Sequence, residues 1–160
     1  MLRRRAVAAG IPTVCEFFSP GTVERIRSDS GHADIVIARN VIPHVANTHE
    51  VLAAIGQLLH GGGLAVIEFH QAEAILRDLQ YDSIYHEHVF YFSLASLNHA
   101  LNRHAMVIVD ATPQDTHGGS MRYVVSRQGE NPVNPNVLSL RHREESLRLT
   151  EEATFSSLRK

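Results

Sequence analysis

The first 70 residues alternate between short, continuous apolar runs and segments in which apolar residues recur at helical spacing. The helical spacing is clearest between Val51 and Leu59, where apolar residues follow one another three or four positions apart. Continuous apolar runs are typical of strands that are buried on both faces of a parallel sheet. The pattern therefore predicts an α/β fold with a doubly wound sheet, whose strands lie at 13–18, 34–39 and 64–69.

Helix-end signals mark the boundaries of the segments between these strands. Gly10 is placed to end a helix over residues 1–9, and Ser19 is placed as the N-cap of a helix that continues to about residue 28. Pro20 suits the first turn of that second helix. The run Gly61–Gly63 is predicted to end the helix that begins near Val51.

The second half has a different order of elements, with two adjacent strands and more helix. The predicted elements are helices over 72–79 and 94–104, strands over 106–111 and 121–126, a linker rich in Pro and Asn over 129–135, and a polar helix over 137–160. Ser93 is expected to be the N-cap of the helix over 94–104. The last helix has few apolar anchors, so it is expected to be largely exposed.

Composition restricts the class of protein. The chain has 160 residues, is 44% hydrophobic and 20% charged, and carries a net charge of -2, so neither nucleic acid nor an anionic membrane is expected as a partner. Its only cysteine, Cys15, leaves no internal disulfide and no multi-cysteine zinc site. No apolar run is long enough to span a bilayer, and a cytoplasmic location is expected.

The segment Ile84–His88 contains the most concentrated chemistry of the chain. It places a phenol, a carboxylate and two imidazoles in consecutive positions from Tyr85 to His88. Such groups exchange protons near neutral pH. A second polar segment, Thr116–Ser120, follows downstream and includes His117. Together these segments indicate proton chemistry on a small molecule.

Four motifs give the chain a resemblance to a known enzyme family. They are Asn40–Val45, the segment Leu58–Gly63 with Val66–Glu68, the segment Tyr81–His88, and Thr116–Arg122. Because these motifs occur in this order and at this spacing, the chain resembles the S-adenosylmethionine-dependent sugar C-methyltransferases of deoxysugar biosynthesis. The glycine segment alone is weak evidence for the family, whereas the last two motifs are specific. A Lys-Pro pair is more usual before the glycines than the residues found here.

The resemblance implies a domain organisation. Residues 1–70 are expected to be the C-terminal part of a class I, Rossmann-like S-adenosylmethionine-binding domain, and residues 71–160 the start of the C-terminal α/β domain of the family. The chain matches neither the glycine-rich cofactor loop nor the zinc-binding N-terminal domain of the family. It is therefore expected to be a fragment that is inactive alone, unless a separate chain carries the remaining part.

The resemblance also implies roles for individual residues. His88 is the expected general base, because an imidazole titrates near neutral pH and the corresponding family histidine is thought to serve in that role. Tyr85 is expected to bind the enolate oxygen or share the base role, and Glu87 to orient an imidazole or bind sugar hydroxyls. His44 follows a predicted strand, where ligands bind in doubly wound sheets. His86 is expected to be structural.

The expected ligands are S-adenosylmethionine and a nucleotide-linked keto-deoxysugar. Cofactor contacts are assigned to Glu16, Phe17, Phe18 and Asn40, and substrate contacts to His117 and Arg122. Residues 16–18 and Asn40 are equally compatible with ordinary core and cap roles. The expected reaction is methylation of the carbon beside a ketone, in which a base first removes a proton to form an enolate.

Two alternatives remain open from the sequence. One is a folded remnant that has no turnover. The other is a metal-dependent hydrolase, in which His86 and His88 form a His-x-His pair that Asp82 or His117 completes. No His-Glu-x-x-His motif and no second cysteine supports this alternative, and the main expectation includes no metal ligand.

Overall fold

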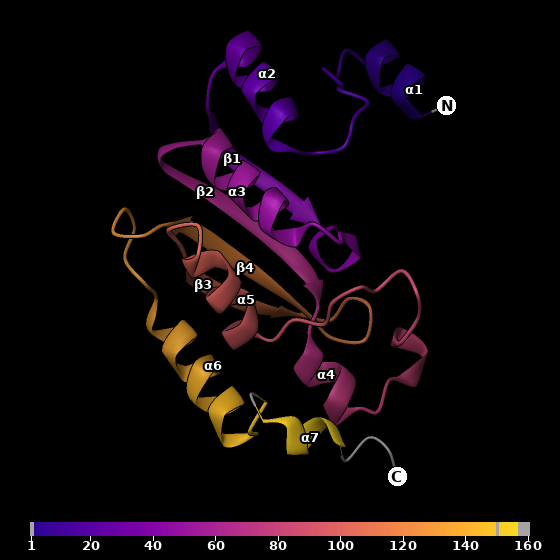
Figure 1. Cartoon of the computed structure of the whole chain (residues 1–160), viewed down its shortest axis with the longest axis vertical. Helices are drawn as coiled ribbons and strands as arrows, with labels where there is room; N and C mark the ends of the chain where they lie inside the picture. The colour runs from indigo at the N-terminus through magenta and orange to yellow at the C-terminus, as the bar shows by residue number, and fades with distance from the viewer. Residues whose placement is uncertain (1, 150, 157–160) are drawn as a thin grey trace.

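The computed structural model of the chain describes residues 2–149 and 151–156. Within these residues a mixed sheet has four strands in the order β1-β2-β4-β3 (Figure 1). The strands are β1 (Ala33–Arg39), β2 (Leu59–His70), β3 (Met106–Gln114) and β4 (Ser120–Arg127). The helices are α1 (Leu2–Ala8), α2 (Pro20–Ser30), α3 (Thr48–Leu58), α4 (Ala72–Arg77), α5 (Leu94–Asn102), α6 (Pro135–Ser146) and α7 (Glu152–Ser156), with single 3-10 turns η1 (Ile42–His44) and η2 (Tyr81–Ser83).

A parallel β-α-β unit forms the first half of the sheet. β1 and β2 run parallel, with Ile35 opposite Leu64 and Arg39 opposite Glu68, and α3 connects them. This arrangement confirms the predicted strands at 34–39 and 64–69, but β1 is not buried on both faces as expected, because Ile35 and Ile37 are 59% and 72% exposed. The carboxyl ends of parallel strands meet at one edge of a sheet, which is where ligands bind in α/β folds. That edge is the position of the candidate site.

β4 joins the two halves of the chain in one sheet. It lies between β2 and β3 and pairs antiparallel with both. The α/β class is confirmed, and the sheet is mixed, with β1 and β2 as its parallel part. The hydrogen-bonded ladder therefore continues across residue 70, where the sequence predicts a domain boundary. The division into segments 1–70 and 71–160 as parts of two domains stays a prediction.

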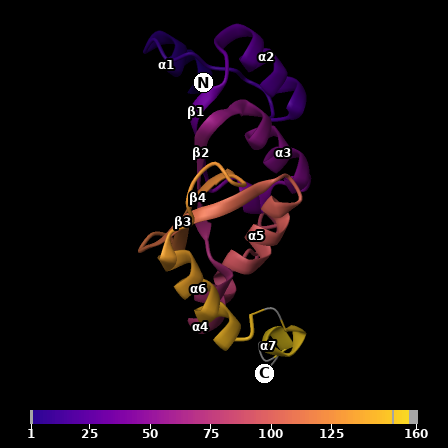
Figure 2. The same cartoon turned by 90° about the vertical axis from the view of Figure 1, so that its left-hand side faces the viewer.

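Helices α3 and α5 lie on the same side of the sheet (Figure 2). Leu52 and Ile55 of α3, together with Leu97 and Leu101 of α5, are at most 1% exposed. They belong to one apolar cluster with the sheet residues Ile67, Phe69, Ile108, Tyr123 and Val125. This apolar cluster supports the sheet at the carboxyl ends of β1 and β2.

The predicted strand at 13–18 is wrong. Residues 11–19 form no helix or strand and lie away from the sheet (Figure 1). A strand needs a hydrogen-bonded neighbour, and in the described residues β1 pairs only with β2. Val14 is 49% exposed and Phe17 is 95% exposed, so this apolar run is not buried.

Two further boundaries differ from the predictions. The helix α3 ends at Leu58, and Gly61–Gly63 lie inside β2. The single helix predicted over 137–160 is instead divided into α6 and α7, because Arg148 between them has a left-handed φ of 54° that interrupts helical geometry. Residues 150 and 157–160 of that prediction lie outside the described residues. Among the described helices, none is long and apolar enough to cross a membrane.

Candidate active site

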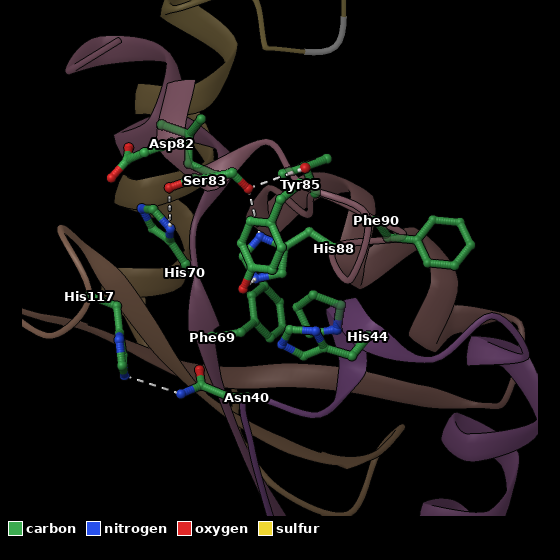
Figure 3. Close-up of a pocket in the computed structure, with 13 residues that line it drawn as sticks. Asn40, His44, Phe69, His70, Asp82, Ser83, Tyr85, His88, Phe90 and His117 are labelled. Atoms are coloured by element: carbon green, nitrogen blue, oxygen red, sulfur yellow. Dashed lines mark hydrogen bonds between the residues drawn. The ribbon is translucent and has the colours of Figure 1, made fainter. Parts of the chain in front are cut away.

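A pocket of about 390 Å³ lies at the carboxyl ends of β1 and β2 (Figure 3). It combines four histidines with aromatic rings and one carboxylate. The lining residues are Asn40, Pro43, His44, Phe69, His70, Ile75, Asp82, Ser83, Tyr85, His88, Phe90, Tyr91 and His117. The pocket therefore brings together both segments that the sequence marks as chemically important.

One excursion of the chain supplies most of this lining. Residues 72–92, which we call the pocket segment, leave the end of β2 and return at the start of α5. The two ends are joined, because the Ala72 N–H donates to the Phe92 carbonyl at 3.0 Å. Ser93 and Ser96 then form a reciprocal capping box, which confirms the predicted N-cap at Ser93. The pocket segment is thus a closed loop on the edge of the sheet.

His88 is held by the backbone of its own loop. Its Nδ1 lies 2.8 Å from the Ser83 carbonyl oxygen, and its Nε2 lies 3.2 Å from the Tyr85 hydroxyl. A carbonyl oxygen only accepts, so a neutral His88 ring carries its proton on Nδ1. The lone pair is then on Nε2, where the Tyr85 hydroxyl donates to it. This tautomer presents a basic nitrogen toward the phenol, as a proton-transfer pair requires.

His44 is oriented in the same manner. It ends the turn η1, and its Nδ1 lies 2.9 Å from the Glu87 carbonyl oxygen. A neutral His44 therefore also keeps its lone pair on Nε2. The two imidazole rings of His44 and His88 have centroids 4.8 Å apart. The backbone N–H groups of Val89 and Phe90 both donate to the Pro43 carbonyl, which joins the pocket segment to η1.

The side chains of His86 and Glu87 point away from the pocket. Their side chains are 90% and 65% exposed, and neither residue lines the cavity. Glu87 contributes to the site through its backbone carbonyl, which binds His44. The expected roles of the Glu87 carboxylate in orienting an imidazole or binding a sugar stay predictions.

Asn40 and His117 meet at the rim of the pocket. The Asn40 amide nitrogen lies 3.3 Å from His117 Nε2, so the end of β1 contacts the loop before β4. Both residues adopt left-handed backbone conformations, with φ of 52° and 53°. Gly119 follows with φ of 121°, and a Cβ there would meet Ala74 Cβ at 2.7 Å, so this position requires glycine.

Arg122 lies beside the pocket in a charged cluster and does not line the cavity. Glu68 is directly opposite Arg39 on one side and Arg122 on the other across the three strands. Its side chain is 5% exposed, and it accepts from Arg39 Nε at 2.9 Å and Arg122 Nε at 2.8 Å. Burial alone would raise the pKa of Glu68, but the hydrogen bonds and charges of the two arginines lower it.

The segment Glu16–Phe18 does not reach the pocket. The Glu16 carboxylate accepts from Arg25 at 2.7 Å, and this bond lowers the Glu16 pKa. Phe17 extends into solvent, whereas Phe18 packs against the core beneath α3. None of the three lines the cavity, and their assignment to the cofactor stays a prediction.

His70 is a pocket residue to which the sequence interpretation gives no role. It is the last residue of β2, and its Nδ1 lies 3.3 Å from the Ser83 hydroxyl. Its Nε2 is buried, and no described residue meets the hydrogen-bond distance and angle there. Burial lowers the His70 pKa, so this ring favours the neutral form. Its position at the end of a predicted strand was the available signal, the same one that identified His44.

The structure offers no support for the metal-site alternative. In residues 2–149 and 151–156, no group of three or more His, Cys, Asp or Glu side chains is placed to hold a metal ion. His86 points to solvent, and His88 is engaged with Ser83 and Tyr85. The two histidines of the His-x-His pair therefore do not converge.

The fold is that of an α/β methyltransferase. A solved S-adenosylmethionine-dependent methyltransferase from Anabaena variabilis ATCC 29413 aligns with a TM-score of 0.54 at 12% identity, over 72% of this chain and 58% of that chain. The O-methyltransferase NcsB1 of neocarzinostatin biosynthesis, solved with S-adenosyl-L-homocysteine and 1,4-dihydroxy-2-naphthoic acid, aligns with a TM-score of 0.54 at 14% identity, over 79% of this chain and 38% of that chain.

Sequence comparison assigns the family. The family described as a methyltransferase domain matches residues 6–109, which is more than half of the chain, so the chain belongs to this family. A curated relative, the C-methyltransferase NovU of Streptomyces niveus, is 33% identical over 138 residues, which are 86% of this chain and 33% of the relative. The chain thus spans about a third of the length of this relative.

Proposed function

We propose that this chain is part of an S-adenosylmethionine-dependent C-methyltransferase that methylates the carbon beside a ketone in a nucleotide-linked deoxysugar. The observation that carries the proposal is the His88–Tyr85 pair, in which a backbone carbonyl holds Nδ1 and leaves the Nε2 lone pair toward the Tyr85 hydroxyl. The family match and the similarity to a C-methyltransferase support the reaction class.

The residues of the pocket have defined tasks in this reaction. His88 Nε2 removes a proton from the carbon beside the ketone, and the electron pair of that C–H bond forms an enolate. The Tyr85 hydroxyl moves its hydrogen bond from Nε2 to the enolate oxygen, which frees the lone pair and stabilises the negative charge. The removed proton stays on His88, whose Nδ1–H remains bound to the Ser83 carbonyl. His44 lies against the same ring and is the second proton acceptor.

S-adenosylmethionine supplies an electrophilic methyl group on a positively charged sulfonium. The pocket suits such a cation, because Phe69, Tyr85, Phe90 and Tyr91 present aromatic rings and Asp82 adds a carboxylate. None of the described lining residues is a lysine or an arginine. Asn40, at the end of β1, is the lining residue we assign to the cofactor, with Glu16, Phe17 and Phe18 as contacts that rest on the sequence alone.

The substrate contacts follow from the rim of the pocket. His117 lines the cavity next to Asn40, where it is available to sugar hydroxyls. The side chains of Arg122 and Arg39 are 47% and 58% exposed, and Glu68 accepts hydrogen bonds from both guanidinium groups. A pair of fixed guanidinium groups suits the phosphate groups of a nucleotide-linked sugar. The cytoplasmic location and a separate partner chain are further parts of the proposal, and they rest on the sequence alone.

The test separates proton removal from methyl transfer. Because the chain is expected to be inactive alone, it is joined to the remaining segments of a homologous C-methyltransferase. The fusion is incubated in D2O with a nucleotide-linked keto-deoxysugar, and NMR follows the loss of the proton beside the ketone against a protein-free control. Trideuteriomethyl S-adenosylmethionine is then added, and mass spectrometry follows label in the sugar. His88→Ala is expected to slow exchange by about a hundredfold or more, the usual scale for a general base. Tyr85→Phe is expected to slow it less.

His86→Ala is the matched control, because His86 is next to the site in sequence but points to solvent. It is expected to keep the rate of the wild-type chain. Exchange that persists in His88→Ala refutes the base assignment. If the unaltered fusion shows neither exchange nor transfer, the proposal fails for this chain, and the inactive remnant is the remaining alternative.

A further inference from the structure

Glu144 is a deeply buried acidic residue outside the pocket. It lies on α6 and is 2% exposed. Its carboxylate accepts hydrogen bonds from the Leu94 N–H at 2.7 Å, the Ala95 N–H at 2.9 Å and the Gln71 side-chain amide at 3.0 Å. Burying a charge is costly unless hydrogen bonds satisfy it. These three bonds satisfy Glu144.

The first contact of Glu144 is the N-terminus of α5. Leu94 and Ala95 are the first two residues of that helix, and their N–H groups have no partner within it. Ser93 satisfies the next free N–H, that of Ser96. The positive end of the helix dipole also favours a carboxylate there. Glu144 therefore joins α6 to the start of α5, beside which α6 runs (Figure 1).

The second contact of Glu144 lies at the opposite end of the pocket segment. Gln71 immediately precedes residues 72–92, and Leu94 follows them after Ser93. The Ala72–Phe92 backbone hydrogen bond joins the same two ends. A single carboxylate from α6 therefore holds both sides of the base of the pocket segment.

We propose that Glu144 is a positioning residue that closes the base of the pocket segment and thereby fixes the geometry of Tyr85 and His88. The inference rests on the proposed function only in treating these two side chains as the reacting pair. At the tip of the segment, Ile84 and Tyr85 are 54% and 42% exposed. The residues that follow them are held by hydrogen bonds of Val89 and Phe90 to Pro43 and of the Glu87 carbonyl to His44. His88 depends on the Ser83 carbonyl in the same segment, so loosening the base changes the environment of Nδ1.

The test compares Glu144→Gln with Glu145→Gln in the same chain. Both substitutions remove one negative charge from α6, but Glu145 is exposed and, within the part of the chain that the structure describes, its side chain pairs with Arg141 on the helix surface. The glutamine amide at position 144 keeps one acceptor and places a donor against the N–H groups of α5. Amide hydrogen exchange measures opening of the pocket segment, and ¹⁵N NMR of the imidazoles reports which nitrogen of His88 carries the proton.

In Glu144→Gln, exchange over residues 78–91 is expected to accelerate by about tenfold while the strands β2 and β4 stay protected. The His88 signals are expected to move from the Nδ1–H form toward a mixture of tautomers. Glu145→Gln is expected to change neither. Unchanged His88 signals in a folded Glu144→Gln chain, or equal acceleration in every element, overturn the proposal.

If Glu144→Gln does not fold, Gln71→Met decides the question. It removes one of the three bonds to Glu144 and keeps a side chain of similar length. The same local signature is expected at a smaller size, and its absence overturns the proposal. Neither readout uses turnover, so a failure of the methyltransferase proposal stays distinguishable from a failure of this one.

Discussion

Replacing Glu68 with glutamine tests the charged cluster at the edge of the pocket. Glu68 is buried between Arg39 and Arg122, and each arginine donates to a different carboxylate oxygen. Glutamine keeps one acceptor, but its amide group then faces a guanidinium donor without an acceptor. The substitution should therefore remove at least one charge-assisted bond and leave a buried donor poorly satisfied.

The size of the expected destabilisation follows from the burial of Glu68. A hydrogen bond to a charged group contributes about 1.5–3 kcal/mol. Both arginine side chains are about half exposed, so water satisfies their guanidinium groups after the change, and the loss stays below the full cost of breaking a buried pair. We expect a loss of about 2 kcal/mol in the free energy of unfolding at neutral pH. For a chain of this size, this corresponds to a decrease in Tm of about 4–8 °C.

The pH dependence makes the test specific. Because the folded-state pKa of Glu68 is lowered, its stabilising contribution is present above the unfolded-state pKa, about 4.3, and is lost as the pH falls through the folded-state pKa. Urea unfolding followed by circular dichroism should therefore show a difference between the two proteins that is constant from pH 6 to 8 and shrinks below about pH 4. A difference that does not change with pH would refute the ionic explanation. Glu16→Gln, which loses an exposed bond to Arg25, is the control and should have a much smaller effect.

Two further predictions concern pH and self-association. Burial lowers the pKa of His70, so the folded protein loses stability as the pH falls from about 6.5, the unfolded-state pKa, through the lower folded-state pKa. The Tm measured by thermal unfolding should therefore depend less on pH between 7.5 and 5 in His70→Asn, and an unchanged pH dependence of the Tm would contradict the burial argument. Ile35 and Ile37 are 59% and 72% exposed on β1, whose second edge is unpaired in the described residues. Sedimentation velocity should therefore detect self-association of the unaltered chain, and Ile37→Lys should reduce it. A clean monomer of the unaltered chain would contradict the expectation that this edge causes association.

Local patterns predicted the parts of the fold that depend on local contacts. The parallel strands and the caps at Ser19 and Ser93 follow from apolar runs and capping chemistry, and the structure contains both caps. The order of the sheet did not follow, because the insertion of β4 between β2 and β3 depends on pairing between distant segments. Residues 13–18 have the composition of a strand, but the described residues provide no neighbouring strand for them.

In the candidate site, too, the sequence predicted some features and not those that depend on contacts between distant residues. The identities of Tyr85, His88 and His44 were sufficient to propose proton chemistry, and the pocket contains all three. Glu144 gave no signal, because its partners Gln71 and Leu94 are far from it in sequence. A buried glutamate in a polar helix has the same sequence appearance as an exposed one, and only the folded contacts distinguish it from Glu145.

Backbone groups orient the imidazoles of His44 and His88, and residue identity alone does not reveal this contribution of Glu87. Its carboxylate points to solvent, whereas its carbonyl oxygen fixes the tautomer of His44. The Ser83 carbonyl does the same for His88. A carbonyl oxygen is present at every residue, so such a contact leaves no trace in the sequence. The segment around Tyr85 therefore forms a turn that brings two carbonyl groups and one phenol to two histidine rings.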